Sequence, residues 1–158
     1  MGGFDYMNVL QDTVNVLKEA GWHEGRKIDT MGMEEYLISS GYEVFPTVKT
    51  FLEEFGMLEI NTKNKRAEIS GIGSSGKFHH TNPEKAIKGY FTAGSFGQEE
   101  LYAGEKLVPV GEIDNGYLHL FVSETGKICC ETSKLGDNAW EAWDCIIQQR
   151  GVKGWGHD

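Results

Sequence analysis

Apolar residues in the first part of the chain recur every three or four positions, which is the spacing of one helix face. This pattern predicts helices over residues 4–20, 31–40 and 46–55, each followed by a glycine that suits a helix end. Pro46 stands in the first turn of the third helix, where the backbone N–H has no helical partner. The apolar face of that helix consists of Val48, Phe51, Leu52 and Phe55.

The second part of the chain has the pattern of strands. Residues 107–114 and 117–123 flank Asn115-Gly116, a dipeptide preferred in two-residue hairpin turns. A third strand over residues 128–132 follows after a short turn, so that these strands form a meander. Earlier in the chain, three short strands are predicted over residues 42–45, 58–60 and 66–70. We expect the last two of these to pair across a polar turn.

Three more helices are predicted. Asn82 followed by proline marks the start of one that reaches about residue 91, and residues 98–103 form a shorter one. The last helix covers residues 138–149, and its expected core face is Ala139, Trp143, Ile146 and Ile147.

The order of these elements predicts the fold class. Helices gather early and the meander late, which favours an α+β fold with an antiparallel sheet packed against N-terminal and C-terminal helices. The length of 158 residues suits one compact domain. We therefore predict a single domain over residues 1–150 and a loose C-terminal tail over residues 151–158.

Charge narrows the choice of partner. The net charge is −9, and direct binding to nucleic acid needs clustered lysine and arginine instead. The charge is uneven: residues 1–60 carry −7, residues 61–93 carry +4 and residues 94–158 carry −6. Acidic surfaces steer basic partners toward a protein, although acidity can also serve solubility alone.

The sequence also predicts a compartment. It contains no apolar run of about 20 residues, the length that crosses a bilayer, and its start lacks a basic segment and an apolar run. Adjacent Cys129 and Cys130 are expected on opposite faces of a strand, where they cannot form an ordinary disulfide with each other. Together with Cys145 they give an odd count, which suits a reducing cytosol.

Two motifs that could indicate a nucleotide or metal site lack the surrounding sequence that such a site needs. Residues 71–76 spell G-x-G-x-x-G, but the next predicted helix starts about six residues later, and a dinucleotide site needs the helix directly after the motif. His79 and His80 are adjacent, and further ligands at zinc-binding spacing are missing. Both histidines are interpreted as helix-entry or surface residues. The sequence therefore predicts neither a cofactor nor a metal.

Catalytic patterns are absent as well, since there is no G-x-S-x-G elbow and Cys145 is expected to be packed on its helix. Acidic pairs such as Glu34 with Glu35 do not face each other on a helix. Two tryptophans flanked by glycines remain. Trp22 is expected to anchor its loop on the core, and Trp155 is the best candidate for an exposed or interface aromatic.

A series of short segments resembles the SUKH superfamily of bacterial immunity proteins, and its third subgroup in particular. The segments run in order from about residue 17 to residue 147, and each is weak alone. They are Ala20-Gly21-Trp22, Gly25-Arg26-Lys27, Asp29, Gly41, Phe45-Pro46, residues 51–56, Leu58, Ile60, Asn82-Pro83, Ala86, residues 104–107, residues 109–112 and Gly116-Tyr117.

The resemblance implies an α+β fold with a curved antiparallel sheet, no catalytic residues and no cofactor. It implies a cytoplasmic protein that binds and neutralises a cognate polymorphic toxin, often a nuclease or another toxin that targets nucleic acid. Such toxins need basic surfaces to hold phosphate, and an acidic inhibitor can cover those surfaces.

The acidic residues of the predicted hairpin and the chain after it are the expected partner contacts. These are Glu112, Asp114, Glu131 and Asp137, with Trp155 as an added aromatic contact. Two other functions stay open: a general interaction or regulatory module without a toxin, and a small hydrolase whose carboxylates meet only in the fold. The sequence does not predict the oligomeric state.

Overall fold

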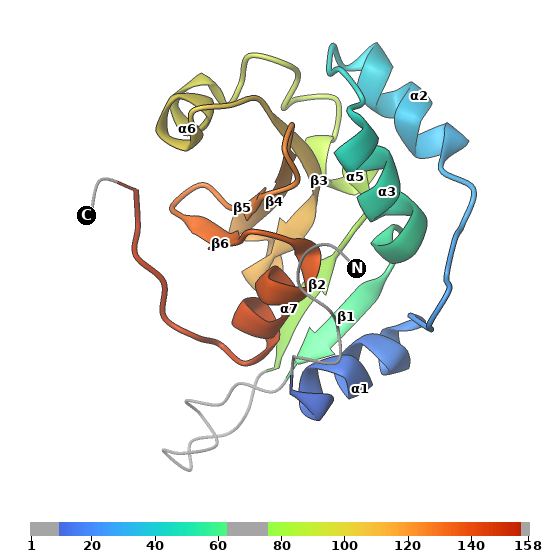
Figure 1. The fold of residues 1–158 in the computed structure, drawn as a ribbon. Helices are drawn as coiled ribbons and strands as arrows, with labels where there is room; N and C mark the ends of the chain where they lie inside the picture. The colour runs from blue at the N-terminus through green and yellow to red at the C-terminus, as the bar shows by residue number, and fades with distance from the viewer. Residues whose placement is uncertain (1–9, 63–75, 156–158) are drawn as a thin grey trace.

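The structure is a computed structural model that describes residues 10–62 and 76–155 (Figure 1). Its helices are α1 (Gln11–Ala20), α2 (Met31–Ser39), α3 (Pro46–Phe55), α5 (Pro83–Ile87), α6 (Gly97–Ala103) and α7 (Ala139–Ile147). Its strands are β1 (Glu59–Thr62), β2 (Lys77–His80), β3 (Leu107–Ile113), β4 (Leu118–Ser123), β5 (Ile128–Cys129) and β6 (Lys134–Gly136). A short 3₁₀ turn, η2 (Asp114–Gly116), links β3 and β4.

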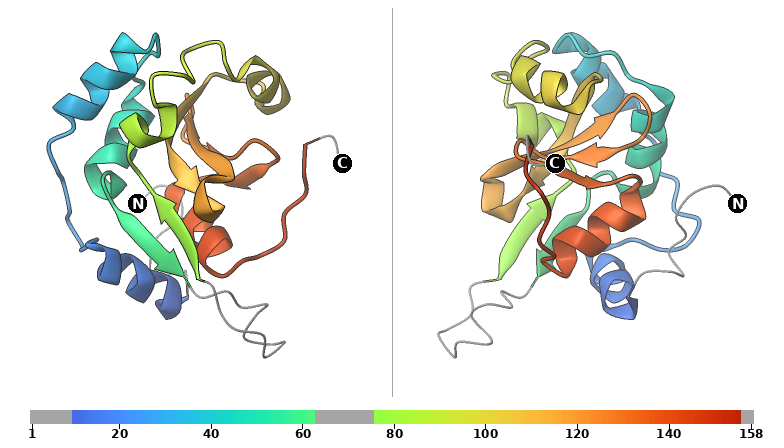
Figure 2. Two further views of the ribbon diagram at one scale, coloured as in Figure 1. Left: turned by 180° about the vertical axis from the view of Figure 1, so that it is seen from behind. Right: turned by 60° about the vertical axis from the view of Figure 1, so that its left-hand side comes forward.

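The strands of the described residues form one sheet in the order β1-β2-β3-β4-β5-β6. Every neighbouring pair is antiparallel, so the strands follow one another across the sheet in chain order. The sheet is strongly curled, and helices lie on both of its sides (Figures 1 and 2). The predicted α+β class and the curved antiparallel sheet are confirmed.

The two faces of the sheet pack against different partners. On the helical face, side chains of α1, α3 and α7 join strand residues in the main hydrophobic core. On the other face, which we call the α6 face, a smaller cluster contains Phe96, Phe121 and Cys129, with Trp155 packed against it. Cys130 belongs to the main core, so Cys129 and Cys130 point to opposite faces as the strand pattern predicts.

Aromatic rings fill the centre of the main core. Trp22 is 3% exposed, and its ring meets Trp140 edge-on with centroids 5.1 Å apart. Phe55 packs edge-on against Trp140 at 5.4 Å. The Trp22 indole N–H donates a hydrogen bond to Glu54 at 3.0 Å, so the ring is buried without losing its polar contact. Trp22 therefore anchors its loop on the core as predicted.

Local chemistry explains the helix boundaries. Gly21 ends α1 with φ of 116°, a left-handed conformation that costs glycine little. The side chain of Asn82 accepts hydrogen bonds from the backbone N–H groups of Glu84 and Lys85, and Asn138 accepts one from Glu141. These contacts satisfy N–H groups that a helix leaves free at its start, so both asparagines act as N-caps.

Several predicted elements are wrong in detail. Residues 42–45 are not a strand, and the hairpin turn is longer than two residues because Ile113 pairs with Leu118 across the loop. Residues 66–70 lie outside the described residues, and β1 pairs with β2. The predicted third strand is only β5, followed by the unpredicted β6, and the helix that starts after Asn82 ends at Ile87.

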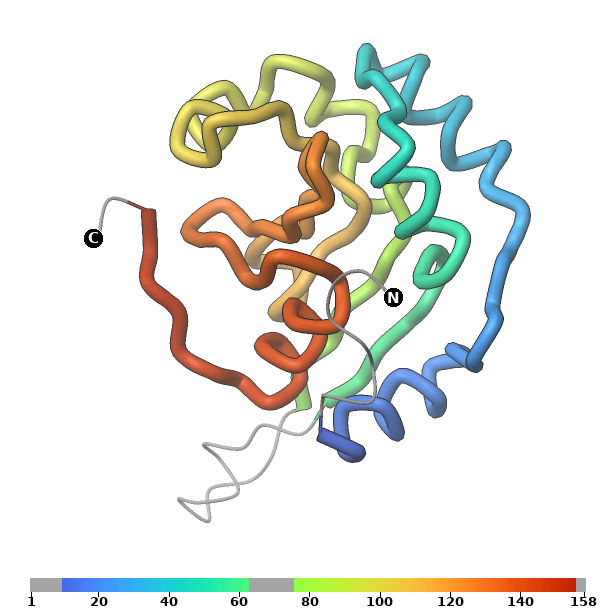
Figure 3. Tube along the Cα trace, in the orientation of Figure 1, coloured from blue at the N-terminus to red at the C-terminus, as the bar shows by residue number. Residues whose placement is uncertain are grey.

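The core face of α7 is also wider than predicted. Trp140 and Cys145 are buried beside Trp143, Ile146 and Ile147, whereas Ala139 is half-buried. After α7 the chain runs back toward α6 without a helix or strand through residue 155 (Figure 3). None of the helices in the described residues has the length and apolar character to cross a bilayer.

Candidate protein-binding site

The five residues predicted to contact a partner separate into two groups. Glu112, Glu131 and Trp155 are brought together on the α6 face or its rim. Asp114 lies in η2, 3.6 Å from the ammonium of Lys77. Asp137 follows β6 and pairs with Lys134 at 2.7 Å. Glu112 and Glu131 also pair with residues of the same chain, namely with His80 and His119.

Strand register aligns three polar side chains across the α6 face, and the side chain of Glu131, just beyond β5, extends the row. Glu112 on β3 lies opposite His80 on β2 and opposite His119 on β4. The His80 Nε2 lies 2.8 Å from Glu112 Oε1, and the His119 Nδ1 lies 2.6 Å from Glu131 Oε2. We call these four residues the His–Glu row. The sequence alone does not reveal the His–Glu row, because the row depends on how strands that are distant in the chain pair with one another.

Hydrogen-bond partners assign protons in the row. The backbone N–H of Asn82 donates to His80 Nδ1, so His80 carries its proton on Nε2 and donates it to Glu112. His119 is different, because Nδ1 faces Glu131 and Nε2 faces the carbonyl oxygen of Ala86 at 3.1 Å. Both nitrogens of His119 therefore act as donors, which is the charged form.

The surroundings of His119 favour this charged form. Burial alone lowers the pKa of His119, but the hydrogen bond and the charge of Glu131 raise it further than burial lowers it. The Ala86 carbonyl and the Glu112 carboxylate raise this pKa as well. The imidazole also lies edge-on to Phe91, at a ring distance of 4.6 Å. The row is thus a largely buried, internally satisfied polar network, with Glu131 at its partly exposed end.

His79 points to the helical face beside the row and is just as enclosed. It is 1% exposed, accepts a hydrogen bond from the backbone N–H of Asp114 at 3.0 Å, and lies 3.5 Å from Thr62 Oγ1. The prediction of surface residues is therefore wrong for both histidines, whereas His80 does stand at the entry of α5, where its Nδ1 accepts the hydrogen bond from Asn82. Strand β2 pairs on both sides, and its sheet is covered on both faces, so neither side chain of this dipeptide reaches solvent.

The cysteines are packed. Burial raises the pKa of the Cys129 thiol to about 12 and raises that of Cys145. Thiols with raised pKa are poor nucleophiles. The described residues contain no group of three or more side chains arranged to hold a metal ion. Residues 71–75 of the glycine motif lie outside the described part of the chain.

Trp155 is half-buried at the edge of the α6 face. Its ring stacks on Tyr102 with centroids 6.4 Å apart, and its backbone N–H donates to the carbonyl of Thr132 at 2.8 Å. Leu101 and Tyr102 on α6 are 73% and 51% exposed. The predicted interface aromatic therefore lies in an aromatic patch that is partly open to solvent.

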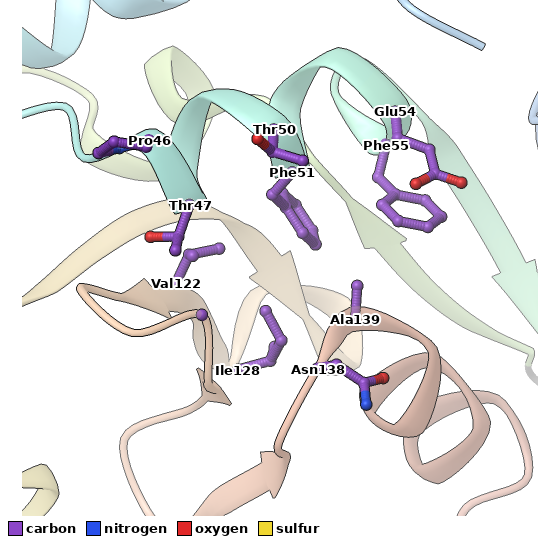
Figure 4. Close-up of a pocket in the computed structure, with 11 residues that line it drawn as sticks. Pro46, Thr47, Thr50, Phe51, Glu54, Phe55, Val122, Ile128, Asn138 and Ala139 are labelled. Carbon is purple, nitrogen blue, oxygen red and sulfur yellow. The ribbon is translucent and has the colours of Figure 1, made fainter. Parts of the chain in front are cut away.

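A shallow apolar cavity of about 310 Å³ opens between α3 and the start of α7 (Figure 4). Phe51 and Phe55 point into it from α3, opposite Ile128 and Ala139. Its one ionisable side chain is Glu54, which already accepts the hydrogen bond from Trp22. The cavity lacks the converging titratable groups that a catalytic centre requires.

A second hollow, which we call the α2–α3 groove, has a different lining. It has a volume of about 360 Å³ and lies between α2, α3 and the loop before α2. Its apolar side chains are Ile28, Met31 and Ile38. Its charged side chains are Asp29, Glu34, Glu35, Glu53 and Lys49. Sequence reasoning missed this groove because its residues come from three segments that meet only when α2 packs beside α3.

The described residues thus form a curled antiparallel sheet flanked by helices, with one nearly apolar cavity and one groove lined by apolar and mostly acidic side chains. The sequence matches the SUKH-3 immunity protein family over residues 9–149, which is most of the chain. The chain belongs to this family of immunity proteins. No curated protein and no solved structure matches it.

Proposed function

We propose that this protein neutralises a cognate toxin domain in the cytosol by binding it, without catalysing a reaction. The observation that carries the proposal is membership of the SUKH-3 immunity protein family across residues 9–149. The packed cysteines, the satisfied His–Glu row and the nearly apolar cavity beside α3 support a binding function rather than catalysis.

Charge supports a toxin that acts on nucleic acid. The chain carries a net charge of −9, and enzymes that grip phosphate present basic surfaces. Complementary charge speeds association and selects among partners. The binding site of such an enzyme is therefore the part of the toxin that this protein is best suited to cover.

Only three of the five residues predicted to contact the partner remain available for it. Glu112 has only 10% of its side chain exposed, and it already binds His80 and lies 3.4 Å from Lys88. Glu131 is held by His119. Asp114, Asp137 and Trp155 reach solvent, but each of these acids faces a lysine of the same chain. We therefore treat these three residues as secondary contacts, because single contacts of this kind add little affinity.

Co-expression tests the function. The product of the gene adjacent to this one, as the proposed toxin, is expressed in bacteria with and without this protein, and growth is compared. The expected result is that growth is rescued and that the two chains elute together on size exclusion. Absence of both rescue and a complex would refute the proposal.

A titration separates binding from catalysis. If this protein acts by occupying the toxin, protection in a purified assay saturates when the two chains are equimolar. A catalytic inhibitor would protect at a small fraction of that amount. Protection at strongly substoichiometric amounts would therefore contradict the binding mechanism.

A further inference from the structure

Helix α2 presents a face that no other described element covers. It lies on the outside of α3, away from the sheet (Figures 1 and 2). Of its nine residues, Leu37 alone is fully buried. Met31 and Ile38 are seven positions apart, which is two helical turns, so they share one face of α2. Their exposed fractions are 64% and 61%. Exposed apolar side chains grouped in a hollow are a mark of interaction sites.

Carboxylates surround this apolar stripe. Glu35 lies between Met31 and Ile38 along the same face of α2, and Asp29 lies just before the helix. The two lysines next to the groove lie at the limit of ion pairing, with Lys49 at 3.9 Å from Glu34 and Lys27 at 4.0 Å from Glu53. Both lysines are largely exposed, and such pairs are weak.

Asp29 and Glu35 have no cation partner among the described residues. They differ in this from the four acids predicted as contacts, each of which lies within ion-pairing distance of a histidine or lysine of the chain. The groove therefore combines two carboxylates without an ion-pairing partner in the described chain with open apolar surface.

We infer that the α2–α3 groove is the main docking face for the toxin and takes a segment in which lysine or arginine flanks a bulky apolar side chain. This inference rests on the proposed function and adds the place and chemistry of contact. The apolar side chain packs against Met31 or Ile38, and the basic groups reach Asp29 and Glu35. Phosphate is excluded by the carboxylates.

A second copy of this chain is a poor occupant. Symmetric pairing would bring one acidic groove against another, and like charges facing each other oppose association. The groove therefore fits a basic partner better than it fits itself.

The test measures the affinity of the full chain for a catalytically inactivated form of the proposed toxin, the product of the adjacent gene, by isothermal titration calorimetry. D29N/E35Q removes two charges from the groove, and M31S/I38S removes its apolar stripe. D114N/D137N is the matched comparison, because it also removes two exposed carboxylates. All six positions are at least partly exposed, and urea unfolding checks that each variant keeps its stability.

We expect each groove variant to weaken binding by about tenfold or more, the scale of a central contact. D114N/D137N should change it less than about threefold, as secondary contacts do. D29N/E35Q should also flatten the dependence of affinity on salt.

Four results overturn the inference. Unchanged affinity in both groove variants, or an equal loss in D114N/D137N, would place the interface elsewhere and leave the proposed function standing. Groove variants that dissolve a homodimer, seen by light scattering, would assign the groove to a second copy. Failure of the wild-type chain to bind the toxin domain would overturn the proposed function and, with it, this inference.

Discussion

Acid should destabilise this protein through His79, well above the pH at which carboxylates are protonated. Burial lowers the pKa of His79 from 6.5 to about 4, with Lys77 adding to the shift and Asp114 opposing it. The unfolded chain then binds a proton at a higher pH than the folded chain does. Stability from this group is present above about pH 6.5 and is lost as the pH falls toward 4.

The shift sets the size of the effect. Each unit of pKa difference corresponds to about 1.4 kcal/mol, so the full loss between pH 6.5 and about 4 is about 3 kcal/mol. About half of this should be lost between pH 6.5 and pH 5, where the unfolded histidine is mostly protonated and the folded one is not. His119 does not disturb this range, since its pKa is raised and its contribution changes only above 6.5.

Urea unfolding followed by tryptophan fluorescence at about pH 6.5 and about pH 5 measures the loss. H79N is the matched control, because an asparagine oxygen can accept the hydrogen bond from the Asp114 backbone N–H without titrating. We expect the free energy of unfolding of the wild-type chain to fall by about 1.5 kcal/mol more than that of H79N. Parallel changes in the two proteins would refute the assignment of this pH dependence to His79.

Three other predictions concern stability. E131Q removes the carboxylate that binds charged His119, and should lower the free energy of unfolding by about 2 kcal/mol at pH 6. The loss should be smaller at pH 8.5, because the stabilisation decreases as His119 loses its proton. Equal losses at both pH values would contradict the charged pair. R26K replaces a guanidinium that donates to two carbonyl oxygens at the end of α3, and urea unfolding should show a loss of about 1 kcal/mol. G111A would place a Cβ 2.0 Å from a carbonyl oxygen of β2 and should lower the thermal midpoint sharply, whereas G97A, with open space around it, should not.

Sequence reasoning predicts best what depends on local chemistry. Proline at the first turn of α3, the Asn82 cap and the left-handed Gly21 each fix a boundary through their immediate neighbours. The opposite directions of Cys129 and Cys130 follow from strand alternation alone. These features need no knowledge of what lies across the sheet.

Sequence reasoning is least successful where the residues that contact one another are distant in the chain. One failure is local: the chain closes the predicted two-residue hairpin turn with a four-residue loop in which Asp114 and Asn115 adopt positive φ. Glu112 looks like a solvated acid until the register places it between two histidines. His80 looks exposed for the same reason. Burial of a polar residue in a strand depends on what covers both faces, and composition does not record that.

The outward face of α2 has an evolutionary consequence. Its exposed positions can change at little cost to folding, because Leu37, together with Met33 and Tyr36, makes the contacts of the helix with the core. Mutational tolerance is thus concentrated on the surface that we assign to partner recognition, while the sheet with its buried polar row stays constrained. A toxin that alters its contact segment can then be followed by substitutions in one outer helix, and specificity can drift while the scaffold is retained.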